Sequence, residues 1–300
     1  MNSILLKAKR EKSLLRHHPW VFSGAIAKIN GDPQFGETVD IIAHDGRFLG
    51  RGAYSPQSQI TVRIWTFDEN EPVTMDFFRS RLERAIRLRE SLITRDRVNA
   101  YRLVNAESDS LPGVIVDRYA DYLVCQFLTA GAELWKQTII SQLQELIICK
   151  GIYERSDVSV REKENLDQKT GVIAGELPPD LIEIKESDIS YFVDVKHGQK
   201  TGFYLDQREN RSAIGNYARD REILNCFSYT DGFAIPALIS GAASVTNIES
   251  SAGAVELAIK NAELNEIDAD RNEHTEADVF TQLRRYRDSR REFDLIILDP

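Results

Sequence analysis

The last third of the chain alternates between short apolar runs and amphipathic segments. Apolar runs within Ile223–Ile235, Ser244–Ser250 and Phe293–Pro300 have the length and composition of buried strands. Apolar residues at helical spacing precede or separate these runs, over residues 207–217, 253–264 and 281–286. Strands that alternate with helices in this way predict an open α/β sheet.

One stretch in this region predicts a ligand site. Ile223–Ile235 begins apolar, breaks into small and polar residues, and resumes as an apolar helix. In an open α/β sheet, the turn after such a strand lies at the edge where ligands bind. The amides at the start of the following helix can meet a polar or anionic group there.

The first 74 residues have a different pattern, of short β-strands separated by glycines. Val39–Ala43 and Gln59–Trp65 alternate or cluster β-branched residues. Trp20 and Phe22 come shortly after five basic residues, Lys7, Lys9, Arg10, Lys12 and Arg16. Basic residues beside aromatics suit an RNA strand with unstacked bases. The alternative is a solvated basic terminus whose Trp20 and Phe22 enter the core.

The middle of the chain predicts a long helix and then a small α+β domain. Apolar residues recur at spacings of four and seven over Asp76–Thr94. Another face of this helix carries three arginines, which either contact RNA or pair with glutamates in solvent: Arg81, Arg84 and Arg87. Residues 100–192 then read as strand, strand, helix, strand and strand, with the helix over 133–148 and the last strand at 191–195.

Composition narrows the class of protein. The formal charge of −9 excludes a strongly basic nucleic-acid binder, although local basic patches can still supply RNA affinity. The three cysteines form no C-x-x-C pair, which argues against a disulfide framework or a zinc site. No apolar run is long enough to span a membrane, and the N-terminus lacks the apolar core of a signal peptide. We therefore expect a cytoplasmic protein with no membrane partner and no metal.

Polar residues after each predicted strand suggest which ligand binds. The turn contains only Gly232 where a dinucleotide turn has G-x-G-x-x-G, so NAD and FAD are disfavoured. S-adenosylmethionine has no pyrophosphate and needs only a looser turn. Glu249 ends the second strand about twenty residues past the turn, where a carboxylate can accept both ribose hydroxyls. Asp278 can accept from an adenine amino group, with Val279 and Phe280 flanking the ring.

Two more segments complete this predicted site. Gly198–Arg208 frames a polar loop in which Lys200 or Thr201 can meet a carboxylate; the alternative is an ordinary turn before a helix. Asp299, in the Asp-Pro that ends the last strand, faces the reacting group at the carboxyl edge of the sheet.

Several segments resemble known families. Arg16–Ile26, Gly36–Ile41 and Phe48–Pro56 resemble the small PUA barrel, an RNA-binding module. The three acids above, in this order after the strands, resemble class I S-adenosylmethionine-dependent methyltransferases. Asn225–Thr230, with Gln199–Gly202 and Leu205–Arg208, narrows the resemblance. The chain resembles in particular the large-subunit rRNA methyltransferase I family, which makes 5-methylcytosine in 23S ribosomal RNA, over essentially all 300 residues.

The resemblance implies an architecture of three parts. These are a PUA domain over residues 1–74, a helical linker with a central α+β domain over 75–193, and a Rossmann-like α/β methyltransferase domain over 194–300. It implies S-adenosyl-L-methionine as cofactor and 23S rRNA as partner, bound through the five early basic residues. The implied cofactor contacts are Lys200, Thr201, Tyr204, Asn225, Phe227, Ser228, Tyr229, Thr230, Gly232, Glu249, Ser250, Asp278, Val279 and Asp299, of which Asp299 also orients the cytosine.

Two departures from the family pattern stand out. Asp231 occupies a position where the family usually has a second glycine, and its carboxylate is expected near the methionine end of the cofactor. The sequence given ends at Pro300, whereas in the family a later motif carries the nucleophilic cysteine. Cys226 lies within the first strand, and we expect it to be buried and inert, so the nucleophile is absent from this sequence.

These departures leave alternatives open. The alternatives to an enzyme that makes 5-methylcytosine are a methyltransferase for another RNA base and a non-catalytic RNA-binding protein. A sheet that ends after its fourth strand also predicts an exposed edge and self-association, for example as a homodimer.

Overall fold

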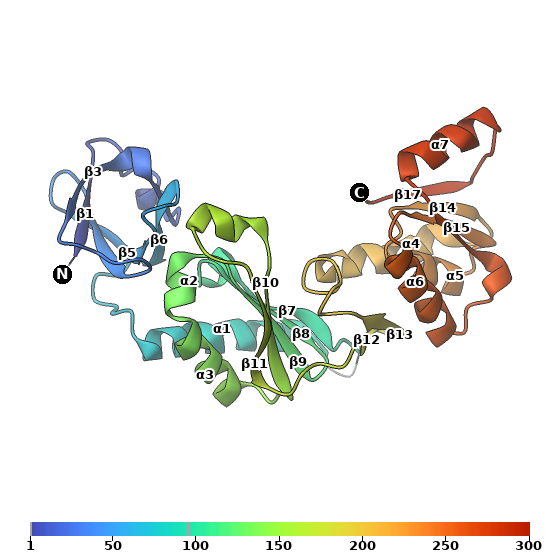
Figure 1. The fold of residues 1–300 in the computed structure, drawn as a ribbon, viewed down its shortest axis with the longest axis horizontal. Helices are drawn as coiled ribbons and strands as arrows, with labels where there is room; N and C mark the ends of the chain where they lie inside the picture. Colours follow the sequence, from blue (N-terminus) through green and yellow to red (C-terminus); the bar gives the residue numbers. More distant parts are fainter. Residues whose placement is uncertain (1, 95–96) are drawn as a thin grey trace. The chain divides into compact units, whose positions relative to one another are not determined.

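The computed structural model describes residues 2–94 and 97–300, and the chain divides into two compact units (Figure 1). The first unit holds residues 1–95 and 101–179, and the second holds residues 96–100 and 180–300. The fold is multi-domain, as predicted: a β-barrel and an α+β domain make up the first unit, and an α/β domain dominates the second.

The barrel of the first unit is a six-stranded sheet in the order β2-β6-β5-β4-β1-β3. Its strands are β1 (Ser3–Leu6), β2 (Trp20–Phe22), β3 (Ile26–Asn30), β4 (Thr38–Ile42), β5 (Phe48–Tyr54) and β6 (Ile60–Thr66). Alternate residues such as Ile4, Ile41 and Val62 are fully buried because successive side chains of a strand point to opposite faces. Val21 enters this core, whereas Phe22 is 49% exposed, so the alternative in which Phe22 enters the core is wrong.

The α+β domain of the first unit is a five-stranded sheet in the order β11-β10-β9-β8-β7. The strands are β7 (Ala100–Asn105), β8 (Val114–Tyr119), β9 (Tyr122–Phe127), β10 (Gly151–Ser156) and β11 (Lys169–Gly175), and the helices are α1 (Met75–Leu92), α2 (Ala130–Leu134) and α3 (Lys136–Leu146). The single helix predicted over 133–148 is therefore two helices, with the break at Trp135. Thr74 caps α1, where its side chain accepts from the amide of Phe77.

The strand predicted at 191–195 belongs to a different sheet from the one expected. It forms as β13 (Ile189–Val193) and pairs with β12 (Ile182–Glu186), in a two-stranded hairpin of the second unit. Ile182 and Ile184 are buried and alternate with exposed Glu183 and Lys185, which explains why this short segment is a strand.

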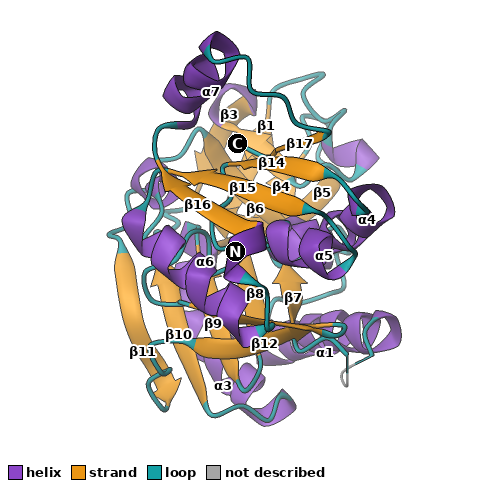
Figure 2. Cartoon of the chain, turned by 90° about the vertical axis from the view of Figure 1, so that its right-hand side faces the viewer, coloured by secondary structure: helices purple, strands orange, loops and turns teal. Residues whose placement is uncertain are grey.

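The second unit contains a four-stranded parallel sheet in the order β16-β15-β14-β17. Its elements are α4 (Arg208–Ala218), β14 (Glu222–Cys226), α5 (Ala234–Ile239), β15 (Ser244–Glu249), α6 (Ala252–Leu264), β16 (Asn272–Glu276), α7 (Val279–Asp288) and β17 (Leu295–Leu298). Figure 2 shows α5 and α6 on one face of this sheet and α7 on the other. The parallel α/β arrangement confirms the prediction and brings the carboxyl ends of β14, β15 and β17 to one edge.

The two faces of this sheet bury different side chains. Ile223 and Val245 pack with α5, whereas Leu224 and Ile248 pack with Val279 of α7. On the edge strand β17, Ile296 and Leu298 are 57% and 62% exposed. In the described part of the chain, no helix is both long and apolar enough to cross a membrane.

Candidate cofactor-binding site

A cavity of about 320 Å³ lies at the carboxyl edge of the parallel sheet. Its volume is at the lower end of the usual range for small-molecule sites. Its wall contains most of the residues predicted to bind the cofactor, namely Lys200, Tyr204, Phe227, Ser228, Tyr229, Gly232, Glu249, Ser250 and Asp299. The structure therefore brings together residues that are up to 99 positions apart in the sequence, as the strand–turn pattern predicted.

The other predicted cofactor residues lie outside the cavity wall. Thr201 and Thr230 are buried, and buried Asn225 donates to Asn247 on the neighbouring strand at 2.9 Å. Val279 is in the apolar core. Asp278 caps α7, where its carboxylate accepts from the amide of Thr281 at 2.8 Å. Hydrogen bonds from the side chain and the backbone of Thr281 lower the pKa of Asp278. These five residues shape the elements around the cavity.

The turn after β14 has an unusual backbone. Phe227, Tyr229 and Asp231 have φ angles of 59°, 49° and 66°, in the left-handed region that non-glycine residues seldom adopt. Within this turn, Phe227, Ser228, Tyr229 and Gly232 line the cavity, whereas Thr230 and Asp231 are buried. Such strained backbone persists only where surrounding contacts hold it.

Glu249 is one of the groups that hold the turn. Its Oε2 accepts from the amide of Tyr229 at 3.1 Å, and its Oε1 accepts from the amides of Ser250 and Ser251 at 2.8 and 2.9 Å. A carboxylate oxygen has two lone pairs, so Oε2 can also accept from a ligand hydroxyl. The predicted role on a ribose is therefore compatible with the structural role of this side chain.

The loop that includes Lys200 and Tyr204 is fastened to the turn by one hydroxyl. Oη of Tyr229 accepts from the amide of Gln199 at 3.0 Å and donates to the carbonyl oxygen of Gly202 at 3.1 Å. The ring of Tyr204 packs edge-on against that of Tyr229, and the ammonium of Lys200 lies 5.6 Å from the Tyr204 ring centroid.

The cavity has an acidic character near Tyr204. Burial raises the pKa of the Tyr204 hydroxyl, and the negative charges of Asp299, Asp206 and Glu249 raise it further. The three carboxylates are therefore close enough to Tyr204 to act on its hydroxyl, and limited solvent strengthens their effect. This arrangement favours a ligand that carries positive charge, such as a sulfonium.

Arg211 on α4 is a cavity residue that sequence reasoning missed. Its guanidinium is 3% exposed and donates to both carboxylate oxygens of Glu186, at 2.8 and 2.5 Å, and to the carbonyl oxygen of Tyr204 at 2.8 Å. It also lies over the ring of Phe203 at 4.5 Å. The other cavity residues missed were Gln199, Phe203, Asp206, Gln207, Phe233 and Pro300. Most of these residues are next in sequence to a residue that was predicted to bind the cofactor, and this is the signal that could have found them.

Asp231 does not lie where the sequence suggested. Its carboxylate is fully buried behind the turn and is not part of the cavity wall. Oδ2 accepts from Nδ2 of Asn272 at 2.9 Å and from Nε2 of His274 at 2.7 Å, both on β16. The expectation that this carboxylate approaches the methionine end of the cofactor is therefore wrong.

The comparisons with known proteins agree with this geometry. A PUA-like domain profile matches residues 4–67, and an S-adenosylmethionine-dependent methyltransferase profile matches residues 150–300. Ribosomal RNA large subunit methyltransferase I of Tolumonas auensis is 52% identical over 299 residues, which are 99% of this chain and 75% of that protein. The chain belongs to this methyltransferase family. Its Escherichia coli member is 48% identical over 297 residues, again 99% of this chain and 75% of that protein.

Solved structures of similar fold support the same class and cofactor. A Streptococcus mutans protein assigned as a SAM-dependent methyltransferase is 25% identical, with a TM-score of 0.87 over 100% of this chain and 77% of that protein. A second solved methyltransferase structure, complexed with SAH, is 25% identical, with a TM-score of 0.89 over 100% of this chain and 76% of that protein. The cofactor of this family member is S-adenosylmethionine, and the acidic cavity fits its positive charge. Within the described ranges, no cluster of three or more potential ligands is arranged to hold a metal ion.

The predicted RNA contacts lie on the barrel of the first unit. Lys7, Lys9, Arg10, Lys12 and Arg16 are all exposed, in the segment between the end of β1 and the start of β2. On α1, Arg81 is half-buried and pairs with Glu71 at 2.7 Å, whereas Arg84 and Arg87 are exposed and Arg87 lies 3.8 Å from Glu83. The early basic segment is therefore better placed than the α1 arginines to meet a phosphate backbone.

Proposed function

We propose that this chain binds S-adenosylmethionine at the cavity and takes part in making 5-methylcytosine in 23S ribosomal RNA. The observation that carries the proposal is the cavity itself, where Glu249, Asp299 and the strained turn meet at the carboxyl edge of a parallel sheet. The name shared by the relatives, which specifies ribosomal RNA of the large subunit, supports the substrate.

The proposed chemistry assigns separate tasks to the residues of the cavity. S-adenosylmethionine supplies an electrophilic methyl group. Glu249 holds the cofactor through a hydroxyl, and Asp299 accepts from the cytosine edge and orients the base beside that methyl group. Cytosine carbon 5 becomes nucleophilic only after a thiolate adds to carbon 6, and the thiolate leaves after a base removes the proton of carbon 5.

The three cysteines of this sequence do not supply that thiolate in the proposal. Cys226 is buried in β14, and burial raises the pKa of its thiol. Cys125 is buried in the first unit with a pKa well above its usual value, because of desolvation and the nearby acids Asp117 and Glu154. Burial also raises the pKa of Cys149. A thiol with a raised pKa is a poor nucleophile at neutral pH.

Two measurements test the proposal. Calorimetry with this chain should show saturable binding of S-adenosylmethionine, and no binding would refute the cofactor site. Mass mapping of 23S rRNA from cells with the gene deleted and then restored should show one 5-methylcytosine lost and regained. Loss of a different modified base would refute the cytosine assignment, and an unchanged rRNA would favour a non-catalytic RNA-binding role.

A further inference from the structure

The turn that lines the cavity is anchored from behind by three different elements. The carbonyl oxygen of Thr230 accepts from Nδ2 of Asn261 on α6 at 3.1 Å. The carbonyl oxygen of Gly232 accepts from the Tyr191 hydroxyl on β13 at 3.1 Å. Between these two, the side chain of Asp231 is held by β16. Of these anchors, Asp231 is the one whose strength depends on charge.

The Asp231 anchor is a buried pair of titratable groups. The Asp231 side chain is 0% exposed and that of His274 is 10% exposed. Because a carboxylate can only accept, Nε2 of His274 must donate across their 2.7 Å contact. Oδ1 of Asp231 is buried without a hydrogen-bond partner, so the carboxylate relies on Oδ2 alone. Such a group is costly to bury unless its partner carries positive charge.

The surroundings make His274 sensitive to this carboxylate. Burial lowers the pKa of His274, but the hydrogen bond to Asp231 and the charge of Asp231 outweigh burial and raise the pKa above its ordinary value. The residue that β15 places opposite His274 is neutral Asn247. On α6, the charged residues Glu256, Lys260 and Glu263 are exposed to solvent. Asp231 is therefore the charged group that acts on His274.

We infer that Asp231 and His274 are positioning residues whose ion pair fixes the cofactor-binding turn, so that affinity for S-adenosylmethionine depends on the protonation of His274. The inference rests on cofactor binding at this cavity, as proposed above. Asp231 has a left-handed φ of 66° and comes immediately before the cavity residue Gly232, so loss of its anchor frees the backbone that meets the ligand. Neither side chain lines the cavity, so both act through the turn.

The direction in which cofactor affinity changes with pH follows from the raised pKa of His274. The ion pair is fully formed below the ordinary pKa of a histidine, and it is lost as pH rises through the raised value. Cofactor affinity should therefore be highest at the acidic end of the range and should fall as pH increases.

The test is calorimetry of S-adenosylmethionine with the full chain, from about pH 6 to about pH 8.5, where histidine titrates. For the unmodified chain, we expect affinity to weaken by at least about fivefold across this range, the low end of measured couplings. His274→Gln and Asp231→Asn should bind more weakly at low pH and with a flat profile. Any titration of the ligand itself is common to all variants, so the difference between profiles is the readout.

Val245→Ala is the matched control. Val245 is fully buried on β15 in the cluster that packs against α5 and does not line the cavity, so its truncation should lower the melting temperature and leave the pH profile intact. If the unmodified chain binds no cofactor at any pH, the proposed function fails. If it binds and His274→Gln retains the same profile, only the present inference is overturned.

A measurement on the unmodified chain covers the case in which the variants fail to fold. The sequence has five histidines, so the ring signals of His274 can be followed through a pH titration by NMR. Coupling between two sites is reciprocal, so bound S-adenosylmethionine should shift the titration midpoint of His274 upward. Identical midpoints with and without the cofactor would overturn the inference.

Discussion

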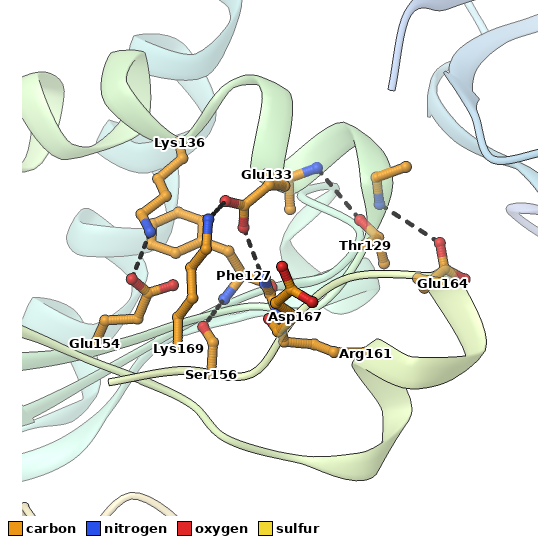
Figure 3. A network of polar contacts seen from close by, with 12 residues as sticks. Phe127, Thr129, Glu133, Lys136, Glu154, Ser156, Arg161, Glu164, Asp167 and Lys169 are labelled. Atoms are coloured by element: carbon orange, nitrogen blue, oxygen red, sulfur yellow. Dashed lines mark hydrogen bonds and ion pairs between the residues drawn. The ribbon is translucent and has the colours of Figure 1, made fainter. Parts of the chain in front are cut away.

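The buried charges of the α+β domain and those around the cofactor-binding turn are arranged in different ways. In the α+β domain, charged side chains neutralise one another: Lys136 pairs with Glu154, and Glu133 accepts from both Arg161 and Lys169 (Figure 3). Around the turn, Glu249 accepts mainly from backbone amides and faces the cavity. A carboxylate held by amides keeps its charge available to a ligand, whereas one held by a cation does not.

The same contrast extends to the join between the barrel and the α+β domain. Glu164, which is 1% exposed, accepts from the hydroxyl of Ser55 and from the guanidinium of Arg63, both at 2.7 Å. The charge of Glu164 is therefore neutralised by Arg63 of the barrel, and this contact joins the barrel to the segment after β10. The buried charges described in the first unit therefore stabilise its fold, whereas the early basic segment is exposed to solvent.

The largest effect is expected for a buried ion pair of the α+β domain. Lys136→Met leaves Glu154, which is 3% exposed, as an unpaired buried charge and should destabilise the first unit by about 3–5 kcal/mol. Urea unfolding measures the loss, and cofactor affinity by calorimetry should not change. Adding Glu154→Leu should restore most of the stability, because an apolar pair of similar volume is often as stable.

Lys169→Met is the control for that experiment. Lys169 is 46% exposed, so the loss of its pair with Glu133 should cost no more than about 1 kcal/mol. Equal effects of Lys136→Met and Lys169→Met would mean that burial does not set the strength of these pairs.

A second variant should affect stability and binding together. Glu186→Gln removes the charge that Arg211 meets in the second unit, which should cost about 1.5–3 kcal/mol of stability. Because Arg211 also binds the Tyr204 carbonyl oxygen, we expect S-adenosylmethionine to bind about tenfold more weakly, a change of about 1.4 kcal/mol. Thermal melting and calorimetry measure the two effects, and a loss of stability with unchanged affinity would contradict the role of Arg211 at the cavity.

A third variant should have a smaller effect on both stability and binding. Tyr229→Phe removes the hydroxyl that joins the turn to Gln199 and Gly202. A typical hydrogen bond contributes about 0.5–1.5 kcal/mol to stability. Calorimetry should show cofactor binding weakened by about threefold to tenfold. Tyr217→Phe, at a site that is 58% exposed, should leave both affinity and melting temperature unchanged. A similar affinity loss in the control would show that the effect is not specific to the turn.

The smallest effects on stability are expected for the exposed charges of the barrel. Lys9→Ala and Lys12→Ala should each change the free energy of unfolding by no more than about 0.5 kcal/mol. If this segment contacts RNA phosphates, each variant should lower the slope of log affinity against log salt by about 1. Filter binding to a 23S rRNA fragment at several salt concentrations measures the slope, with Lys28→Ala on the neighbouring strand β3 as the control. An unchanged slope in both variants would remove this segment from the RNA contacts.

The elements of the parallel sheet could be predicted from the sequence because their patterns are strong. Apolar runs gave β14, β15 and β17, and the order of Glu249 and Asp299 after those strands gave the edge of the cavity. In contrast, β11 was missed, because it is a largely exposed edge strand that contains Gly171 and Gly175 and has no clear alternation.

The details of the site depended on partners that are distant in the sequence. Arg211 is buried because Glu186 lies beside it, 25 residues earlier. Asp231 points behind the turn because Asn272 and His274, more than 40 residues later, hold it there. Asp278 caps α7, which starts at the next residue, and this contact with the amide of Thr281 was not predicted from the sequence. Motif spacing locates a turn, but contacts between elements decide where each side chain points.

The hairpin of β12 and β13 has a consequence for recombining this protein with its relatives. The side-chain amide of Asn265, at the end of α6, hydrogen-bonds both the backbone N–H and the carbonyl oxygen of Ser190. The side-chain amide of Asn261 on α6 does the same for Phe192. A chimera joined at residue 193 would pair a foreign hairpin with the native α6 and could leave these amides without partners. A crossover near residue 180, before β12 begins, carries the hairpin, Glu186 and Arg211 together. Exchange of the residues before that point between family members should keep these contacts within the second unit.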